Sequence, residues 1–132
     1  MKQPTPRVAP ADAAAFEQLV AEALDGIPEE FAPYLENVAV VVEEEPSEEL
    51  LQQLGLDPRR DTLFGLYRGL PLPHRSHDFW GAPPDHITIY RGPLRRAYPG
   101  AQALREQIRR TIVHEIAHFF GLDEGHIQRL GY

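Results

Sequence analysis

The segment from Ala101 to Phe120 constrains the fold more than any other part of the chain. Apolar side chains recur there at every fourth position, at Leu104, Ile108, Ile112, Ile116 and Phe120. This spacing places them on one side of a helix. Gly121 follows, and glycine commonly ends a helix in the left-handed conformation. The sequence therefore predicts a long helix over 101–120 whose apolar stripe faces the core.

Shorter helices are predicted elsewhere. Apolar residues repeat at helical spacing from Phe16 to Leu24, and Gly26 and Pro28 provide the stop signals of a helix that begins near Pro10. Further helical segments are expected over 29–35, over 48–54 behind Ser47 as N-cap and ahead of Gly55, and over 123–130.

Three segments have the composition of strands. Val38 to Val42 is a continuous β-branched and apolar run, which is typical of a strand buried on both faces. The segments 62–68 and 86–91 are also predicted strands, and the second alternates, with Ile87, Ile89 and Arg91 on one face. The Pro- and Gly-rich segment 69–85 between them is predicted to be a loop.

This order of elements, with helices before, between and after a few strands, predicts a mixed α/β layer structure with a small sheet. A chain of 132 residues is too short for two cores, so residues 10–132 are expected to form a single domain. Residues 1–9 are expected to form a disordered lead-in.

Composition excludes several classes of protein. The net charge of −7 disfavours binding to nucleic acid. No apolar run reaches the roughly 20 residues that cross a membrane, and the N-terminal residues do not have the pattern of a signal peptide. We therefore expect a cytoplasmic protein. It contains no cysteine, so any metal must be bound by histidines and carboxylates.

The long helix contains such residues in the motif His-Glu-x-x-His, formed by His114, Glu115 and His118. Histidines four residues apart lie one helical turn from each other, so both imidazoles can bind one Zn²⁺. Glu115 can meet a metal-bound water as a general base. On a helical wheel both histidines point away from the apolar stripe, toward solvent or a cleft.

A third ligand is expected beyond Gly121, where the chain turns. Asp123, Glu124 and His126 are the candidates, and one or two of them could instead cap the terminal helix. Catalytic zinc commonly has three protein ligands and one position for water.

The segment from His114 to Glu124, followed by the ending from Ile127 to Tyr132, resembles the minimal zincin family of short bacterial metallopeptidase-like proteins. The resemblance implies a compact α+β zincin-like fold, in which a small mixed sheet packs against the active-site helix as a single pair of layers. It also implies a Zn²⁺ cofactor and hydrolysis of peptide bonds in a peptide or protein substrate. In metzincins a histidine stands three residues after the glycine. Glu124 occupies that position here, so the resemblance implies Glu124 as third ligand, ahead of Asp123 and His126. The Met-turn of metzincins is absent, because Met1 is the sole methionine.

Other residues are candidates for supporting roles. His74 and His77 have ligand spacing, but their proline-rich surroundings favour an exposed loop. An added substrate strand could pair with 62–68 or with 86–91. Several side chains could stabilise an oxyanion, namely Tyr67, Tyr90, Tyr132, Arg91 and His126.

A zinc metallopeptidase is the leading hypothesis. One alternative is a metal-dependent ribonuclease, because Asp123 stands two residues after Gly121. The other is a non-catalytic module in which zinc stabilises the C-terminal segment.

Overall fold

The computed structural model describes residues 10–69 and 85–132. Its elements follow the chain in the order α1 (Pro10–Asp25), the 3₁₀ helix η1 (Glu29–Phe31), α2 (Ala32–Leu35), β1 (Val38–Glu43), α3 (Glu48–Gln53), β2 (Gly65–Arg68), β3 (Asp85–Tyr90), α4 (Arg91–Ala97), α5 (Ala101–Phe120) and α6 (Glu124–Arg129). The predicted α+β class is confirmed, and the long helix has the predicted bounds. The expectations for residues 1–9 and for His74 and His77 lie outside the described residues.

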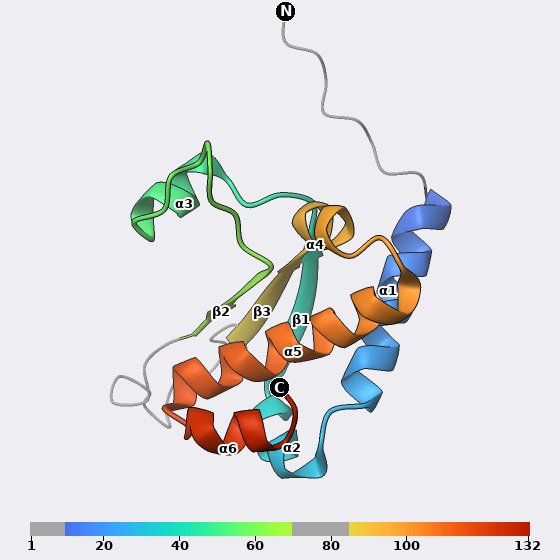
Figure 1. Ribbon diagram of the computed structural model, residues 1–132, viewed down its shortest axis with the longest axis vertical. Coiled ribbons are helices and arrows are strands. Elements are labelled where there is room, and N and C mark those ends of the chain that lie inside the picture. The colour runs from blue at the N-terminus through green and yellow to red at the C-terminus, as the bar shows by residue number, and fades with distance from the viewer. Residues whose placement is uncertain (1–9, 70–84) are drawn as a thin grey trace, which may run out of the picture.

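The three strands form one mixed sheet in the order β1-β3-β2. The central strand β3 is parallel to β1, with Val40 opposite Ile87, and antiparallel to β2, with Tyr67 opposite Ile87. Both strands that flank β3 are therefore edge strands of the described sheet. This arrangement leaves one long side of β2 unpaired within that sheet, on the side that faces α3 and the following segment (Figure 1).

The prediction that Val38 to Val42 is buried on both faces is wrong. Burial alternates along β1, and Val41 is 40% exposed. Its apolar sequence could not reveal that it lies at an edge, where one face is open. The strand with both faces buried is β3, in which Ile87 and Ile89 are fully buried and Thr88 and Tyr90 are 4% and 1% exposed.

Helix α4 is absent from the sequence-based prediction, which assigned Arg91 to the preceding strand. Proline is tolerated in the first helical turn, where its missing N–H would have no partner within the helix, and Pro93 occupies that turn here. The N–H of Gly92 donates to the carbonyl of Glu44 at 2.8 Å. A Cβ at Gly92 would lie 2.8 Å from the same carbonyl oxygen, so this close contact with the segment after β1 requires glycine.

The predicted strand 62–68 is also shorter than expected, because pairing with β3 begins at Gly65. Ser47 caps α3 as predicted, its hydroxyl accepting a hydrogen bond from the N–H of Leu50 at 3.1 Å. In the acidic segment between β1 and α3, Glu45 pairs with both terminal guanidinium nitrogens of Arg96.

The main core lies between the sheet and the helices α1 and α5 (Figure 1). Buried side chains from all three parts meet there, namely Phe16, Val20, Ala23, Tyr67, Ile87, Ile89, Leu94, Leu104, Ile108, Ile112 and Ile116. The predicted stripe of α5 is thus confirmed from Leu104 to Ile116, and Phe120 is half-buried. Each fully buried aliphatic side chain contributes about 1.5–3 kcal/mol relative to exposure.

A second apolar cluster packs against another side of α5. Phe31 of η1, Val113 and Ala117 of α5 and Ile127 of α6 form it. The main core covers one side of α5, and this second cluster covers another. The remaining side of the helix carries His114 and His118. In the described part of the chain, no helix has the length and apolar composition needed to span a membrane.

Candidate active site

The two histidines occupy the open side of the last turns of α5. His114 is half-buried, and the side chain of His118, one turn later, is 67% exposed. The helix ends at Gly121, whose φ of 65° is left-handed, and the N–H of Leu122 donates to the carbonyl of Ala117 at 2.8 Å. This glycine turn returns the chain toward the histidines, as the sequence predicted.

The candidates for a third ligand take three different positions after this turn. Oε1 of Glu124 lies 2.9 Å from Nε2 of His118. Asp123 instead caps α6, its carboxylate accepting from the N–H of Gly125 at 2.9 Å. Nε2 of His126 lies 2.7 Å from a carboxylate oxygen of Glu30. Of the three, Glu124 is the one that contacts His118.

The types of donor suit a zinc ion, because two imidazoles and one carboxylate form a common catalytic donor set. As they stand, however, no three histidine, cysteine or acidic side chains within residues 10–69 and 85–132 gather closely enough to bind an ion. The side chains of His118 and Glu124 are 67% and 54% exposed. They can change rotamer without disturbing the core, so the types of donor present are chemically compatible with zinc.

Glu115 lies between the two histidines in the sequence and points toward β2. Its Oε1 accepts a hydrogen bond from the backbone N–H of Tyr67 at 3.0 Å. Burial raises the pKa of Glu115 above its ordinary value, while this hydrogen bond and the nearby His118 and His114 act in the opposite direction. A carboxylate whose pKa is raised by burial, and which lines a cleft, is typical of a general base.

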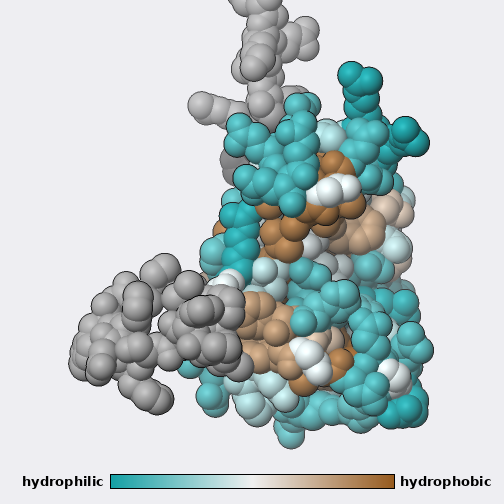
Figure 2. Space-filling view, turned by 90° about the vertical axis from the view of Figure 1, so that its left-hand side faces the viewer, coloured by the Kyte–Doolittle hydropathy of each residue, from teal (hydrophilic) through white to brown (hydrophobic). Residues whose placement is uncertain are grey.

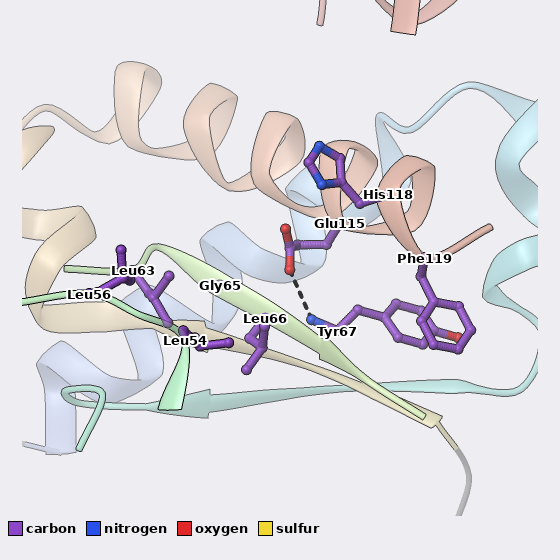
Figure 3. A pocket seen from close by; sticks show the side chains of 9 residues that line it. All are labelled: Leu54, Leu56, Leu63, Gly65, Leu66, Tyr67, Glu115, His118 and Phe119. Atoms are coloured by element: carbon purple, nitrogen blue, oxygen red, sulfur yellow. Dashed lines mark hydrogen bonds between the residues drawn. The ribbon is translucent and has the colours of Figure 1, made fainter. Parts of the chain in front are cut away.

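A groove of about 430 Å³ runs between α5 and β2 beside Glu115. Its lining consists of Leu54, Leu56, Leu63, Gly65, Leu66, Tyr67, Glu115, His118 and Phe119 (Figure 3). Most of these side chains are apolar, and the polar groups are concentrated at Glu115 and His118. Such a cleft, largely apolar with a few polar groups together, is the usual form of a ligand site.

The groove follows the unpaired side of β2. The N–H of Tyr67 donates to Glu115, so it points away from β3. In an antiparallel pair the outward-pointing groups recur at every second residue, so the N–H and C=O groups of Gly65 point the same way. Of the two strands proposed as a substrate edge, β3 is central and its two sides are paired with β1 and β2. The sheet edge at the groove is therefore formed by β2, where the N–H of Tyr67 is bonded to Glu115.

The five candidates for oxyanion stabilisation are scattered. The hydroxyl of Tyr67 donates to Asp85 at 2.7 Å, and its ring stacks on Phe119 with centroids 4.0 Å apart. Tyr90 is 1% exposed. Arg91 pairs with Glu44 at 3.1 Å, His126 contacts Glu30, and Tyr132 packs against the second apolar cluster. Only Tyr67 of this group lines the groove in the described part of the chain.

Sequence reasoning did not find the leucines of the groove or the backbone contact between Tyr67 and Glu115. The leucines belong to the segment 54–66, and Glu115 lies 48 positions after Tyr67. Leucines flanking a glycine and a short strand read equally well as core residues. The signal available was weak: Leu54 and Leu56 stand on either side of Gly55, which ends the helix α3.

Comparison with known proteins agrees with this fold. The family described as zincin-like metallopeptidase matches residues 35–132. The chain therefore belongs to the zincin-like metallopeptidase family. This family implies a metal, typically zinc.

Among solved structures, a conserved hypothetical protein from Thermus thermophilus is similar, with a TM-score of 0.52 and 23% sequence identity over 90% of this chain and 96% of that chain. This similarity concerns the fold. No curated protein matches the chain.

Proposed function

We propose that the protein is a zinc-dependent metallopeptidase in which His114, His118 and Glu124 bind the metal and Glu115 is the general base. One observation carries the proposal: Glu115, which lies between the two histidines in the sequence, lines an apolar groove and accepts a hydrogen bond from the N–H of Tyr67 on β2. Membership of the zincin-like metallopeptidase family supports the same reaction class. The substrate is then a peptide or protein bound in extended form along β2.

The chain's own residues would perform most of the reaction. Bound zinc supplies a polarised carbonyl and a water of lowered pKa. The N–H and C=O groups of Gly65, which line the same side of β2, would contact the peptide backbone. The carboxylate of Glu115 would take a proton from the water and deliver it to the leaving amine. Its raised pKa favours that proton-holding role, because burial disfavours the charged form.

Metal analysis tests the ligand assignment. We expect about one zinc per chain in the purified protein and loss of that zinc in His118→Ala and in Glu124→Ala. Asp123→Ala is the matched control, since Asp123 is adjacent but caps α6. It should retain the metal. Absence of zinc from the unmodified protein would refute the proposal.

Cleavage of a peptide library tests the reaction. Glu115→Gln should bind zinc normally yet lose roughly a hundredfold or more in kcat/KM, the usual size of a general-base contribution. If RNA rather than peptide were cleaved, and Glu115→Gln kept that activity, the ribonuclease alternative would replace this proposal.

A non-catalytic zinc module is the second candidate. It is supported by the 2.9 Å contact between His118 of α5 and Glu124 of α6, because an ion bound there would join the C-terminal helix to α5. This candidate predicts that Glu115→Gln changes no activity or interaction, while His118→Ala destabilises the C-terminal segment.

A further inference from the structure

Three side chains of α5, each one helical turn after the last, contact β2. The methyl group of Thr111 lies next to Gly65. Oε1 of Glu115 accepts a hydrogen bond from the N–H of Tyr67 at 3.0 Å, and Phe119 stacks on the ring of the same tyrosine. Residues four apart share one side of a helix, and alternate residues share one face of a strand. The proposed base therefore occupies the middle of the contact between α5 and β2 (Figure 3).

At Gly65 the helix and the strand are too close for a side chain. A Cβ built there would lie 2.8 Å from the methyl carbon of Thr111 and 3.0 Å from the carbonyl oxygen of Thr88 on β3. The φ of Gly65 is not positive, so its backbone conformation does not by itself require glycine. The space between α5 and β3 is what excludes a side chain at this position.

The methyl group of Thr111 is held in place. Thr111 is 8% exposed, and its hydroxyl donates to the carbonyl of Gln107 at 2.8 Å. Rotation of this stiff, β-branched side chain would break that hydrogen bond. A side chain at position 65 would therefore displace the strand and leave the threonine where it is.

Strand β2 is free to make such a movement. It is an edge strand of the described sheet, whereas β3 is paired on both sides. Figure 2 looks onto the face that contains α3 and β2 and shows hydrophobic surface bordered by hydrophilic residues, so this face belongs to the molecular surface. A displaced β2 would move outward, away from α5.

The movement needed is large enough to break the hydrogen bond to the proposed base. To reach an ordinary contact of 3.4 Å with the methyl group, a Cβ at position 65 would have to recede by about 0.6 Å. The same displacement of Tyr67, two residues along the strand, would lengthen its 3.0 Å bond to Glu115 to about 3.6 Å. A side-chain hydrogen bond is no longer made at that distance.

We propose that Gly65 and Thr111 are positioning residues: their contact sets the separation of α5 and β2 at which the N–H of Tyr67 holds the carboxylate of Glu115. The consequence for catalysis rests on the proposed peptidase function, whereas the hydrogen bond can be measured without it. Misplacement of a catalytic group by about 1 Å can cost roughly a hundredfold in rate. Gly65→Ala is therefore expected to lower kcat about tenfold or more and to change KM by a smaller factor.

Exchange of the Tyr67 amide hydrogen, followed by NMR in the folded full-length protein, tests the contact directly. Glu115→Ala removes the acceptor and so gives the exchange rate without the bond. We expect Gly65→Ala to raise the rate about 2–10-fold toward that value, the factor that one hydrogen bond represents.

A compensating substitution tests the physical cause. Thr111→Ser keeps the hydroxyl that bonds to Gln107 and removes the methyl group nearest the added Cβ. The double variant Gly65→Ala/Thr111→Ser should recover most of the amide protection and most of kcat, and Thr111→Ser alone completes the cycle. Recovery is expected to be incomplete, because the carbonyl of Thr88 remains 3.0 Å from the added Cβ.

Gly92→Ala is the matched control. A Cβ at Gly92 would also meet an atom at 2.8 Å, the carbonyl oxygen of Glu44, but Gly92 belongs to α4. This variant should be less stable, yet its Tyr67 exchange and its kcat should be unchanged. If Gly65→Ala does not fold, Thr111→Ile adds bulk to the same contact from the side of α5 and should have the same effects.

The outcomes separate this inference from the peptidase proposal. Unchanged Tyr67 exchange in Gly65→Ala, or no recovery in the double variant, overturns the positioning role even if the protein cleaves peptides. Faster exchange with an unchanged kcat overturns it as well. Faster exchange that Thr111→Ser reverses supports the positioning of Glu115 even if no peptide is cleaved, and in that case it is the peptidase proposal that fails.

Discussion

The hydrogen bond between Glu115 and the N–H of Tyr67 joins the proposed base to the proposed substrate edge. Its length of 3.0 Å is that of an ordinary hydrogen bond. A substrate strand needs the same N–H for its own carbonyl. Binding of an extended peptide and release of Glu115 from Tyr67 are therefore expected to be linked.

Two variants without the Glu115 carboxylate test whether peptide binding competes with this hydrogen bond. Glu115→Gln retains an oxygen that can accept from the N–H of Tyr67, whereas Glu115→Ala leaves that N–H to the peptide. One hydrogen bond contributes about 0.5–1.5 kcal/mol net. Glu115→Ala should therefore bind an extended, fluorescently labelled peptide roughly 3–10-fold more tightly than Glu115→Gln. Anisotropy titration of both zinc-loaded variants measures the difference. Equal affinities would show that the contact does not compete with substrate.

The same carboxylate should make the metal-free protein sensitive to pH. Burial raises the pKa of Glu115 in the folded state above its ordinary value of 4.5. The folded state then holds this proton more strongly than the unfolded state, so stability falls as pH rises from that value through the raised pKa. Glu115→Gln has no titrating carboxyl at this position, so its stability does not fall in this way. It should be more stable than the unmodified protein at neutral pH.

Urea denaturation in the presence of chelator, repeated across this pH range, measures the effect. The stability advantage of Glu115→Gln should grow between the two pKa values and then remain constant. An advantage independent of pH would show that burial does not raise the pKa of Glu115.

At the scale of elements, the end of α5 controls the position of the third ligand. Gly121 has a φ of 65°, and no atom lies within 4 Å of a Cβ built on it. Gly121→Ala is therefore opposed by backbone conformation alone, at a cost of about 1 kcal/mol. Gly100→Ala is a matched control, since Gly100 has equal space around it but an ordinary φ of −85°.

We expect Gly121→Ala to reduce both the free energy of unfolding and the affinity for zinc, because the turn brings Glu124 to His118. Gly100→Ala should change neither by more than about 0.5 kcal/mol. Denaturant titration and competition with a chromophoric chelator measure the two quantities. Similar behaviour of both variants would mean that the left-handed turn does not position Glu124.

How far the elements could be predicted depended on whether a local signal existed. Helix α5 has a periodic stripe and a terminal glycine, and α6 has Asp123 as its cap, so both were predicted closely. The burial of β1 has no local signal, because Val38 to Val42 are apolar on both faces and the face that packs on the core is decided by residues distant in the chain. The first turn of helix α4 contains Gly92 and Pro93, and the fit of Gly92 depends on contact with Glu44.

At the scale of the whole molecule, zinc would join α5 to α6 across the glycine turn. A ligand that binds only the folded state stabilises it by mass action, by about 2.7 kcal/mol at a hundred times its Kd. For a chain of this size, that free energy corresponds to a rise in Tm of roughly 10 °C.

Thermal unfolding with and without zinc checks this expectation. His118→Ala should abolish the rise, and Asp123→Ala should retain it from a lower starting Tm, because Asp123 only caps α6. A rise that persists in His118→Ala would place the ion elsewhere.

The candidate site was predictable only in part for a related reason. His114, His118 and Glu124 lie on one short segment, so the sequence alone identifies them as candidate ligands. The groove needs the segment 54–67 to lie against α5, and that contact follows from the packing of the sheet on the helix. No spacing rule relates residues so distant in the chain.

The leucines of the groove come from residues 54–66, whereas Glu115 and His118 come from α5. The apolar lining can therefore be exchanged by mutation without changing the proposed base and metal ligands. Replacing residues 54–66 with the corresponding segment of another family member would alter which side chains are accepted, while leaving His114 to Glu124 untouched. Since α3 and the residues after it contribute only Leu51 to the buried set before Gly65, such exchanges should be tolerated by the fold. The same scaffold could thus diversify its targets through one surface segment.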